Sequence, residues 1–189
     1  PAMTQRILNF SAGPAVLPVE VLEEARVLAD QARREGRIRD AVMALPPKQQ
    51  QVFVQQRAQR AQAKLAAERE FLTRNAAEDG VVVLPSGLQY RVLASGDGAQ
   101  PGSDATVRVH YHGTLLDGSV FDSSVERGEP AEFVLSGVIP GFREAISRMR
   151  IGDRWQVFIP SVLAYGERGP LADQALIFEL ELISVVPGE

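Results

Sequence analysis

The sequence contains no cysteine, which excludes disulfide bonds, thiolate catalysis and cysteine-ligated metal sites. Lysine is also scarce, and Lys48 and Lys64 are its only two positions. No apolar run approaches the length of a membrane span, so we expect no transmembrane segment. The net charge of -4 argues against nucleic acid as a main partner. The remaining composition, with 45% hydrophobic and 23% charged residues, is typical of a globular chain.

Charge and periodicity both divide the chain near Asp79-Gly80. Residues 1–79 carry 12 basic and 10 acidic side chains, whereas residues 80–189 carry 8 and 14. The spacing of apolar residues changes from helical to alternating at the same place. We therefore predict a helical segment over residues 1–47, a long connecting helix over residues 48–79 and a globular domain over residues 80–189.

The first third of the sequence is typical of helices. Apolar residues recur every three or four positions from Val19 to Arg39, and Pro46-Pro47 suits the start of a second helix, which we expect to run to about Ala77. Its apolar stripe is narrow, and Glu68 interrupts it; the members are Val54, Ala58, Ala61, Leu65 and Leu72. So thin a stripe cannot bury much of a long helix in a core. Two interpretations stay open, a homodimer formed through the helices or a monomeric spacer.

The last part of the sequence is typical of strands. Thr106 to His112 alternates apolar and polar side chains, and residues 116–119 form a turn signal. Behind Pro140-Gly141, apolar side chains at i, i+3, i+4 and i+7 predict one short amphipathic helix; they are Phe142, Ala145, Ile146 and Met149. The pattern predicts an α+β domain in which a helix lies across an antiparallel sheet.

Four blocks over residues 81–187 resemble the FKBP-type peptidyl-prolyl cis-trans isomerases, in the family's usual order. They are "VRVHYHGTLLDGSVFDSS", "VIPGFREAISRMRIGDRW", "LAYGERG" and "LIFELELI". The preceding "FLTRNAAEDGVVVLPSGLQY" resembles the junction in the macrophage infectivity potentiator (Mip) branch, where a long helix joins the isomerase domain to a helical dimerisation region. The resemblance implies an FKBP-like fold, an antiparallel sheet wrapped around a short helix and preceded by an α-helical region.

The implied reaction is rotation about an X-Pro bond. Its two isomers lie within about 1 kcal/mol of each other, and the barrier of ~18–20 kcal/mol is lost C–N resonance. The twisted amide is less dipolar than the planar one, so a dry, apolar pocket with one or two hydrogen-bond donors favours it. This chemistry requires no nucleophile, metal or cofactor, and we expect none.

The resemblance implies the roles of individual residues. The Tyr165 hydroxyl and the Ile139 backbone N–H would bind substrate carbonyls, and Phe142 would form the floor of the pocket. Asp122 would be an acceptor at the rim, oriented by Tyr111 or Arg127. The substrate-binding residues would be Tyr111, Phe121, Val138, Phe178, Arg127 and Leu171. Singly, the apolar members also fit a plain core, and Asp122 also fits a turn-capping acid.

Three departures from the family pattern predict a shallower cleft with reduced activity or relaxed sequence preference. Phe142 stands where many relatives have tryptophan, and Ala131 stands where some have an aromatic ring, which would leave that side open. The segment between Gly169 and Leu176 is short, and Leu171 is the only apolar residue left in it to overhang the site.

The implied substrates are proline-containing polypeptides, whose folding the protein would assist, and the implied inhibitors are tacrolimus and rapamycin. The alternative is a chaperone or binding module with weak or no isomerase activity. The resemblance favours the periplasm or cell envelope; the cytoplasm follows if Met3, after what looks like the cloning remnant Pro1-Ala2, is the native start.

Two further signals carry no function in this interpretation. Residues 7–25 resemble the opening of phosphoserine aminotransferases, but the remaining length cannot house a pyridoxal-phosphate domain. A fusion, a mis-set gene start and a cloning artefact all stay open as its origin. His110 and His112 share a strand face, but with no third histidine we expect solvent-facing residues rather than a metal site.

Overall fold

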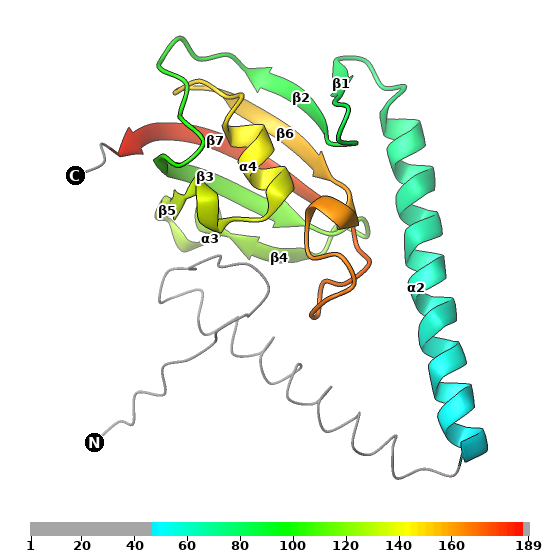
Figure 1. The fold of residues 1–189 in the computed structure, drawn as a ribbon. Coiled ribbons are helices and arrows are strands. Elements are labelled where there is room, and N and C mark those ends of the chain that lie inside the picture. The colour runs from blue at the N-terminus through cyan, green and yellow to red at the C-terminus, as the bar shows by residue number, and fades with distance from the viewer. Residues whose placement is uncertain (1–46, 187–189) are drawn as a thin grey trace, which may run out of the picture.

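The computed structural model describes residues 47–186, which form one long helix and a sheet with short helices (Figure 1). The predicted first helix from Val19 to Arg39 and the aminotransferase-like residues 7–25 lie outside the described residues. The strands are β1 (Val81–Val83), β2 (Gln89–Ala94), β3 (Thr106–Thr114), β4 (Val120–Ser123), β5 (Ala131–Val134), β6 (Arg154–Ile159) and β7 (Leu176–Val186). The helices are α2 (Pro47–Asn75), α3 (Ser124–Arg127) and α4 (Pro140–Ile146), with single 3₁₀ turns at η1 (Leu135–Gly137) and η2 (Ser161–Leu163).

All strand pairs of the sheet are antiparallel. The order is β1-β2-β6-β7-β3-β4, and β5 pairs with β3 beside β4. The long strands β3 and β7 therefore lie side by side near the middle. On β3, Val107, Val109 and Tyr111 are buried while the residues between them are more exposed, as the alternation in the sequence predicts.

The short helix α4 lies across one face of the sheet (Figure 1). Pro140 occupies its first turn, where a missing N–H costs nothing. Its buried side chains are Phe142, Ala145 and Ile146, and Met149 follows in the next turn, so the predicted amphipathic helix is confirmed. Gly141 lets the helix approach the sheet, since a Cβ there would lie 2.4 Å from Ile159 Cγ2.

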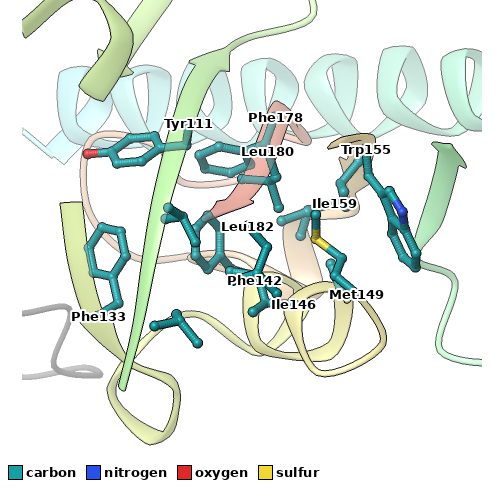
Figure 2. Close-up of a cluster of buried hydrophobic side chains, with 14 of the residues drawn as sticks. Tyr111, Phe133, Phe142, Ile146, Met149, Trp155, Ile159, Phe178, Leu180 and Leu182 are labelled. Atoms are coloured by element: carbon teal, nitrogen blue, oxygen red, sulfur yellow. The ribbon is translucent and has the colours of Figure 1, made fainter. Parts of the chain in front are cut away.

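The core lies between α4 and the sheet. Figure 2 shows Tyr111, Phe133, Phe142 and Phe178 gathered at one end of this cluster and Trp155 at the other. The aliphatic side chains of β6 and β7 fill the middle. A sheet wrapped around a short helix, preceded by a long helix, is the fold class that the sequence predicts.

The long helix α2 packs on the sheet only through its C-terminal half. Phe71 contacts Phe158 with a ring-centroid distance of 5.8 Å, and Asn75 Nδ2 donates to Gln89 Oε1 at 2.8 Å. In the N-terminal half, Val54 is 61% exposed. The helix ends at Asn75, two residues before the predicted end.

The packing face of α2 differs from the predicted stripe. Val54, Ala58 and Leu65 are exposed, whereas Glu68 is only 8% exposed. The expectation that Glu68 interrupts the packing face is therefore wrong. The face is built partly from hydrogen bonds, which an apolar pattern cannot reveal.

Candidate active site

One small cavity, with a volume of about 50 Å³, opens on the aromatic end of the core. The sequence predicts eight of its nine lining residues as site residues. The lining consists of Tyr111, Phe121, Asp122, Phe133, Val138, Ile139, Phe142, Tyr165 and Phe178. Side chains from β3, β4, β5, α4, β7 and two connecting segments thus meet at one place.

The aromatic rings of the cavity pack edge to face. The centroids of Phe142 and Phe178 are 5.3 Å apart at 76°, and those of Phe121 and Phe178 are 5.4 Å apart at 87°. Phe142 also contacts Tyr111 and Phe133, so it touches three rings. Edge-to-face contacts favour fixed ring positions. The cavity therefore has stiff apolar walls, with Phe142 among them at 5% exposure.

Phe133 is the lining residue that sequence reasoning missed. It faces inward on β5, opposite Val107 of β3, and its ring lies 5.6 Å from that of Phe142. The alternation over residues 131–134, with two buried and two exposed side chains, is the signal that places it on the inner face.

Asp122 is fixed at the edge of the cavity by two donors. The Tyr111 hydroxyl donates to Oδ2 at 2.5 Å, and the Arg127 guanidinium donates to Oδ1 at 2.5 Å. Arg127 also donates to the Tyr111 oxygen at 2.8 Å, which closes a three-membered network. The orientation of Asp122 that the sequence assigned to Tyr111 or Arg127 involves both residues.

Burial and the neighbouring groups shift the pKa values of two members of this network, Tyr111 and Arg127. Burial, followed by the charge of Asp122, raises the pKa of Tyr111 well above its usual value, so the phenol stays a neutral donor. Burial lowers the pKa of Arg127, but its hydrogen bonds to Tyr111 and Asp122 outweigh that effect and raise it. The guanidinium remains charged.

The short helix α3 brings Arg127 to this network. Ser123 caps the helix by accepting the Glu126 backbone N–H at 3.2 Å, and Gly128 ends it with a φ of 79°. Ser124 is fully buried; its Oγ accepts the Tyr111 N–H at 2.8 Å and donates to the Tyr111 carbonyl at 3.2 Å. Tyr111 lies between the part of β3 that pairs with β5 and the part that pairs with β4, and Ser124 supplies its hydrogen bonds there.

Two hydrogen-bond donors of the cavity have no partner within residues 47–186. The Tyr165 hydroxyl, in the loop after η2, makes no hydrogen bond there, and neither does the Ile139 backbone N–H at the start of α4. Tyr165 keeps 37% of its surface exposed. Partial burial, followed by the charge of Asp122, raises the pKa of its phenol, so it too stays a neutral donor.

Comparison with known proteins places this geometry in a family. The family model of the FKBP-type peptidyl-prolyl cis-trans isomerases matches residues 97–183, and the model of the domain amino-terminal to such isomerases matches residues 21–92. A solved peptidyl-prolyl cis-trans isomerase from Pseudomonas syringae is 39% identical, and the match covers 67% of this chain and 96% of that one, with a TM-score of 0.62. The chain belongs to the FKBP-type peptidyl-prolyl cis-trans isomerase family.

Other relatives of this FKBP-type chain place it in the Mip-like branch. The structure of FkpA from Escherichia coli is 34% identical over 90% of both chains, with a TM-score of 0.63. The FKBP-type 22 kDa isomerase of Escherichia coli is 51% identical over 69% of this chain, and the outer membrane protein MIP of Legionella longbeachae is 52% identical over 61%. The matches span 65% and 51% of the length of these two curated relatives. Within residues 47–186, no helix combines the length and apolar character that a membrane span requires.

Two of the predicted site residues lie outside the cavity lining of this FKBP-type chain. Arg127 does not line the cavity itself, but it donates hydrogen bonds to Asp122 and Tyr111, which do. Leu171 packs partly buried against the core cluster and is not among the residues that line the cavity. The short loop folds back on itself, because the Asp173 N–H donates to the Gly166 carbonyl at 2.7 Å.

Ala131, where the sequence predicts an open side, does not line the cavity of the FKBP-type domain. Ala131 is 3% exposed and belongs to the core, while Phe133, on the same face of β5, lines the cavity. An aromatic ring from the same strand therefore stands in the cavity wall, and the open side at Ala131 stays a prediction.

The two histidines lie on the opposite face of the sheet, in an open groove of about 480 Å³ that Arg154, Glu179 and Glu181 also line. His110 Nδ1 lies 3.2 Å from Ser124 Oγ, and His112 Nδ1 lies 3.0 Å from Ser123 Oγ. Over residues 47–186 no group of three or more His, Cys, Asp or Glu side chains is arranged to hold a metal ion. The histidines contact the start of α3 rather than the cavity.

Proposed function

We propose that this protein is a peptidyl-prolyl cis-trans isomerase that rotates X-Pro bonds in polypeptides without covalent chemistry. The observation that carries the proposal is the ring-walled cavity with two unpaired neutral donors, from Tyr165 and Ile139, at its edge. Its walls offer no activated nucleophile, and X-Pro rotation needs none. The proposal extends to the whole protein what the family shows for the domain.

The roles of the residues follow from where they lie. A proline ring would pack on Phe142, with Phe121, Val138 and Phe178 around it. The Ile139 N–H and the Tyr165 hydroxyl would each bind a carbonyl of the substrate. The dry walls disfavour the dipolar planar amide, and donors that bind the twisted form more strongly lower the barrier by about 1.4 kcal/mol for each tenfold in rate.

Asp122 would act as a fixed acceptor at the edge of the cavity. Its two oxygens are already engaged by Tyr111 and Arg127, which hold it in one orientation. A carboxylate has lone pairs left after two hydrogen bonds, so it can still face the carbonyl carbon or an N–H of the substrate. It would orient the substrate rather than exchange a proton with it.

A protease-coupled assay on a proline tetrapeptide tests this function. Tyr165→Phe removes the donor, and Asp122→Ala removes the rim acceptor; we expect each to lower kcat/KM by about tenfold. Tyr90→Phe is the matched control, because it removes the same atom from a ring that stacks on Trp155 outside the cavity. An inactive parent protein would refute the proposal.

The rival function, a chaperone or binding module, is distinguished in the same preparation. The small volume of the cavity, about 50 Å³, and the exposed half of α2 are the observations that favour it. A parent protein without isomerase activity that still suppresses aggregation of an unfolded client would support the rival. If Tyr165→Phe suppressed aggregation as well as the parent does, the client would bind a surface other than the cavity.

Inhibition and assembly are further parts of the proposal. Tacrolimus and rapamycin would occupy the aromatic cavity, so Phe142→Ala should weaken their inhibition. A homodimer would form through the N-terminal helical segment, whose first 46 residues lie outside the described structure, and through the exposed half of α2, where Val52 and Val54 are 51% and 61% exposed. Sedimentation of the full chain against a fragment starting near Val81 should give a dimer and a monomer.

A further inference from the structure

The long helix α2 contributes one buried carboxylate to the isomerase domain. Glu68 is 8% exposed; its Oε2 accepts the Ser161 backbone N–H and its Oε1 accepts the Ser161 hydroxyl, both at 3.1 Å. A buried carboxylate is costly unless hydrogen bonds satisfy it, so these two bonds fix the helix against η2. Glu70, two residues on, is exposed and makes no such contact.

Ser161 in turn holds the backbone on both sides of Tyr165. Its carbonyl accepts the Ala164 N–H at 3.0 Å and the Gly166 N–H at 2.8 Å. Glu68 therefore fixes the position of Ser161, whose carbonyl holds the turn that contains Tyr165. One residue, Ser161, thus links α2 to the turn that carries the Tyr165 hydroxyl.

A second contact from α2 reaches the other end of the same segment. Lys64, one turn before Glu68, donates from Nζ to the Ala172 carbonyl at 3.2 Å. The next residue, Asp173, donates its N–H to the Gly166 carbonyl at 2.7 Å. Figure 1 shows this segment, in orange between β6 and β7, on the side of the domain that faces α2. Two side chains one helical turn apart thus hold residues 161–173 at both ends.

We propose that Glu68 is a positioning residue for Tyr165, with Lys64 in support, so that the connecting helix is part of the scaffold of the active site. The role in catalysis rests on the proposed isomerase function. A helix that only linked two domains would need no buried carboxylate on η2. A helix that holds the Tyr165 turn needs a fixed acceptor at this point, because a misplacement of about 1 Å can cost on the order of 100-fold in rate.

The position of Tyr165 can be measured without any activity. The chain has three tyrosines, Tyr90, Tyr111 and Tyr165, so 3-fluorotyrosine gives three ¹⁹F signals, which Tyr→Phe variants assign. We expect Glu68→Ala to shift or broaden the Tyr165 signal and to leave the Tyr90 signal in place. Glu70→Ala, which removes the same charge from the exposed side of the same helix, should move none of them.

Kinetics then separates positioning from a merely structural role. In the full-length protein, Glu68→Ala should lower kcat/KM by about tenfold, and in a Tyr165→Phe background it should cost nothing further, since both changes act through one hydroxyl. Glu68→Gln should restore most of the activity, because its amide can accept the Ser161 N–H and donate to the Ser161 hydroxyl. Lys64→Ala, at an exposed position that leaves the fold intact, should show a smaller loss and a smaller shift.

The outcomes distinguish the two proposals. An unmoved Tyr165 signal in Glu68→Ala would overturn the positioning role whatever the activity. Losses that add fully to that of Tyr165→Phe would overturn it as well. A moved signal in a protein whose parent lacks isomerase activity would support the positioning role and refute the proposed function.

Discussion

At the scale of single residues, the three-membered network of Tyr111, Asp122 and Arg127 orders the edge of the cavity. The side chains of Arg127 and Asp122 are 22% and 13% exposed, so their bond is shielded from water. Exposed ion pairs contribute less to stability, and the pair of Arg148 with Glu144 lies on the surface of α4 and its following turn. The two pairs therefore make a matched comparison.

Arg127→Ala leaves the Asp122 carboxylate with one donor in place of two. We expect it to lower the free energy of unfolding by about 1–3 kcal/mol, the usual cost of removing one partner of a shielded hydrogen bond. Arg148→Ala should cost at most about 0.5 kcal/mol. Urea denaturation of both variants measures the difference, and equal midpoints would contradict the account of the network.

The raised pKa of Tyr111 predicts a dependence of stability on alkaline pH. Because the folded protein holds this proton more tightly than the unfolded chain, the contribution is complete below the ordinary tyrosine value of about 10 and is lost as the pH rises above it. The stability advantage of the parent over Tyr111→Phe should therefore begin to fall between pH 9 and pH 11, around the ordinary value of about 10, and should go on falling at higher pH toward the raised folded-state value. A difference in urea midpoint that stays constant over this range would contradict the prediction.

At the scale of elements, β3 sets the positions of the rings. Gly113, which pairs with Phe178 of β7 and Asp122 of β4, leaves room for two aromatic side chains. A Cβ at this position would lie 2.6 Å from Phe121 Cζ and 2.9 Å from Phe178 Cε1. The absence of a side chain at Gly113 thus makes room for the two rings of the cavity wall.

Gly113→Ala should displace Phe121 and Phe178. We expect a loss of about 1–3 kcal/mol in stability, typical of overpacking, together with reduced isomerase activity. Gly102→Ala is the control, since its Cβ would meet no atom within 4 Å and its φ is not in the left-handed region. Thermal unfolding and the coupled assay would contradict the account if both variants matched the parent.

The sequence predicts the apolar parts of the fold better than the contacts between polar groups, and the reason is physical. Alternation on β3 and the spacing around Phe142 report which side chains are buried, so the sheet and the short helix could be predicted from periodicity. The eight cavity residues were predicted from the resemblance to the FKBP-type family, since periodicity does not separate a pocket wall from a plain core. Contacts made by polar groups leave no periodic trace. The hydrogen bonds of Glu68 to Ser161 and of Ser124 to Tyr111 were missed for that reason, and so was the backbone bond from Asp173 to Gly166 that closes the short loop.

At the scale of the whole molecule, the last turns of α2 belong to the isomerase domain. Phe71 covers Phe158, Asn75 bonds to Gln89, and Gln89 donates to the Leu72 carbonyl at 2.9 Å. A domain boundary drawn at residue 79 would cut through these contacts. The predicted division of the chain at this point stays a prediction, but the packing unit begins before it.

A fragment starting at Val81 should therefore unfold at a lower urea concentration than one starting at Ala61. The shorter fragment loses the Phe71 ring and leaves the buried Gln89 side chain without both of its partners. Each unsatisfied buried polar group costs about 1–3 kcal/mol. Coincident unfolding curves for the two fragments would show that α2 contributes nothing to the domain.

The central claim is that a dry aromatic cavity lowers the barrier to rotation of a proline amide. NMR exchange spectroscopy on a proline peptide at equilibrium measures that rotation directly, with no protease present. We predict that catalytic amounts of the protein accelerate cis-trans exchange, and that Phe142→Ala, which removes the central ring while leaving both donors, reduces the acceleration by at least about tenfold. Exchange at the uncatalysed rate with the parent protein, or undiminished exchange with Phe142→Ala, would contradict the claim.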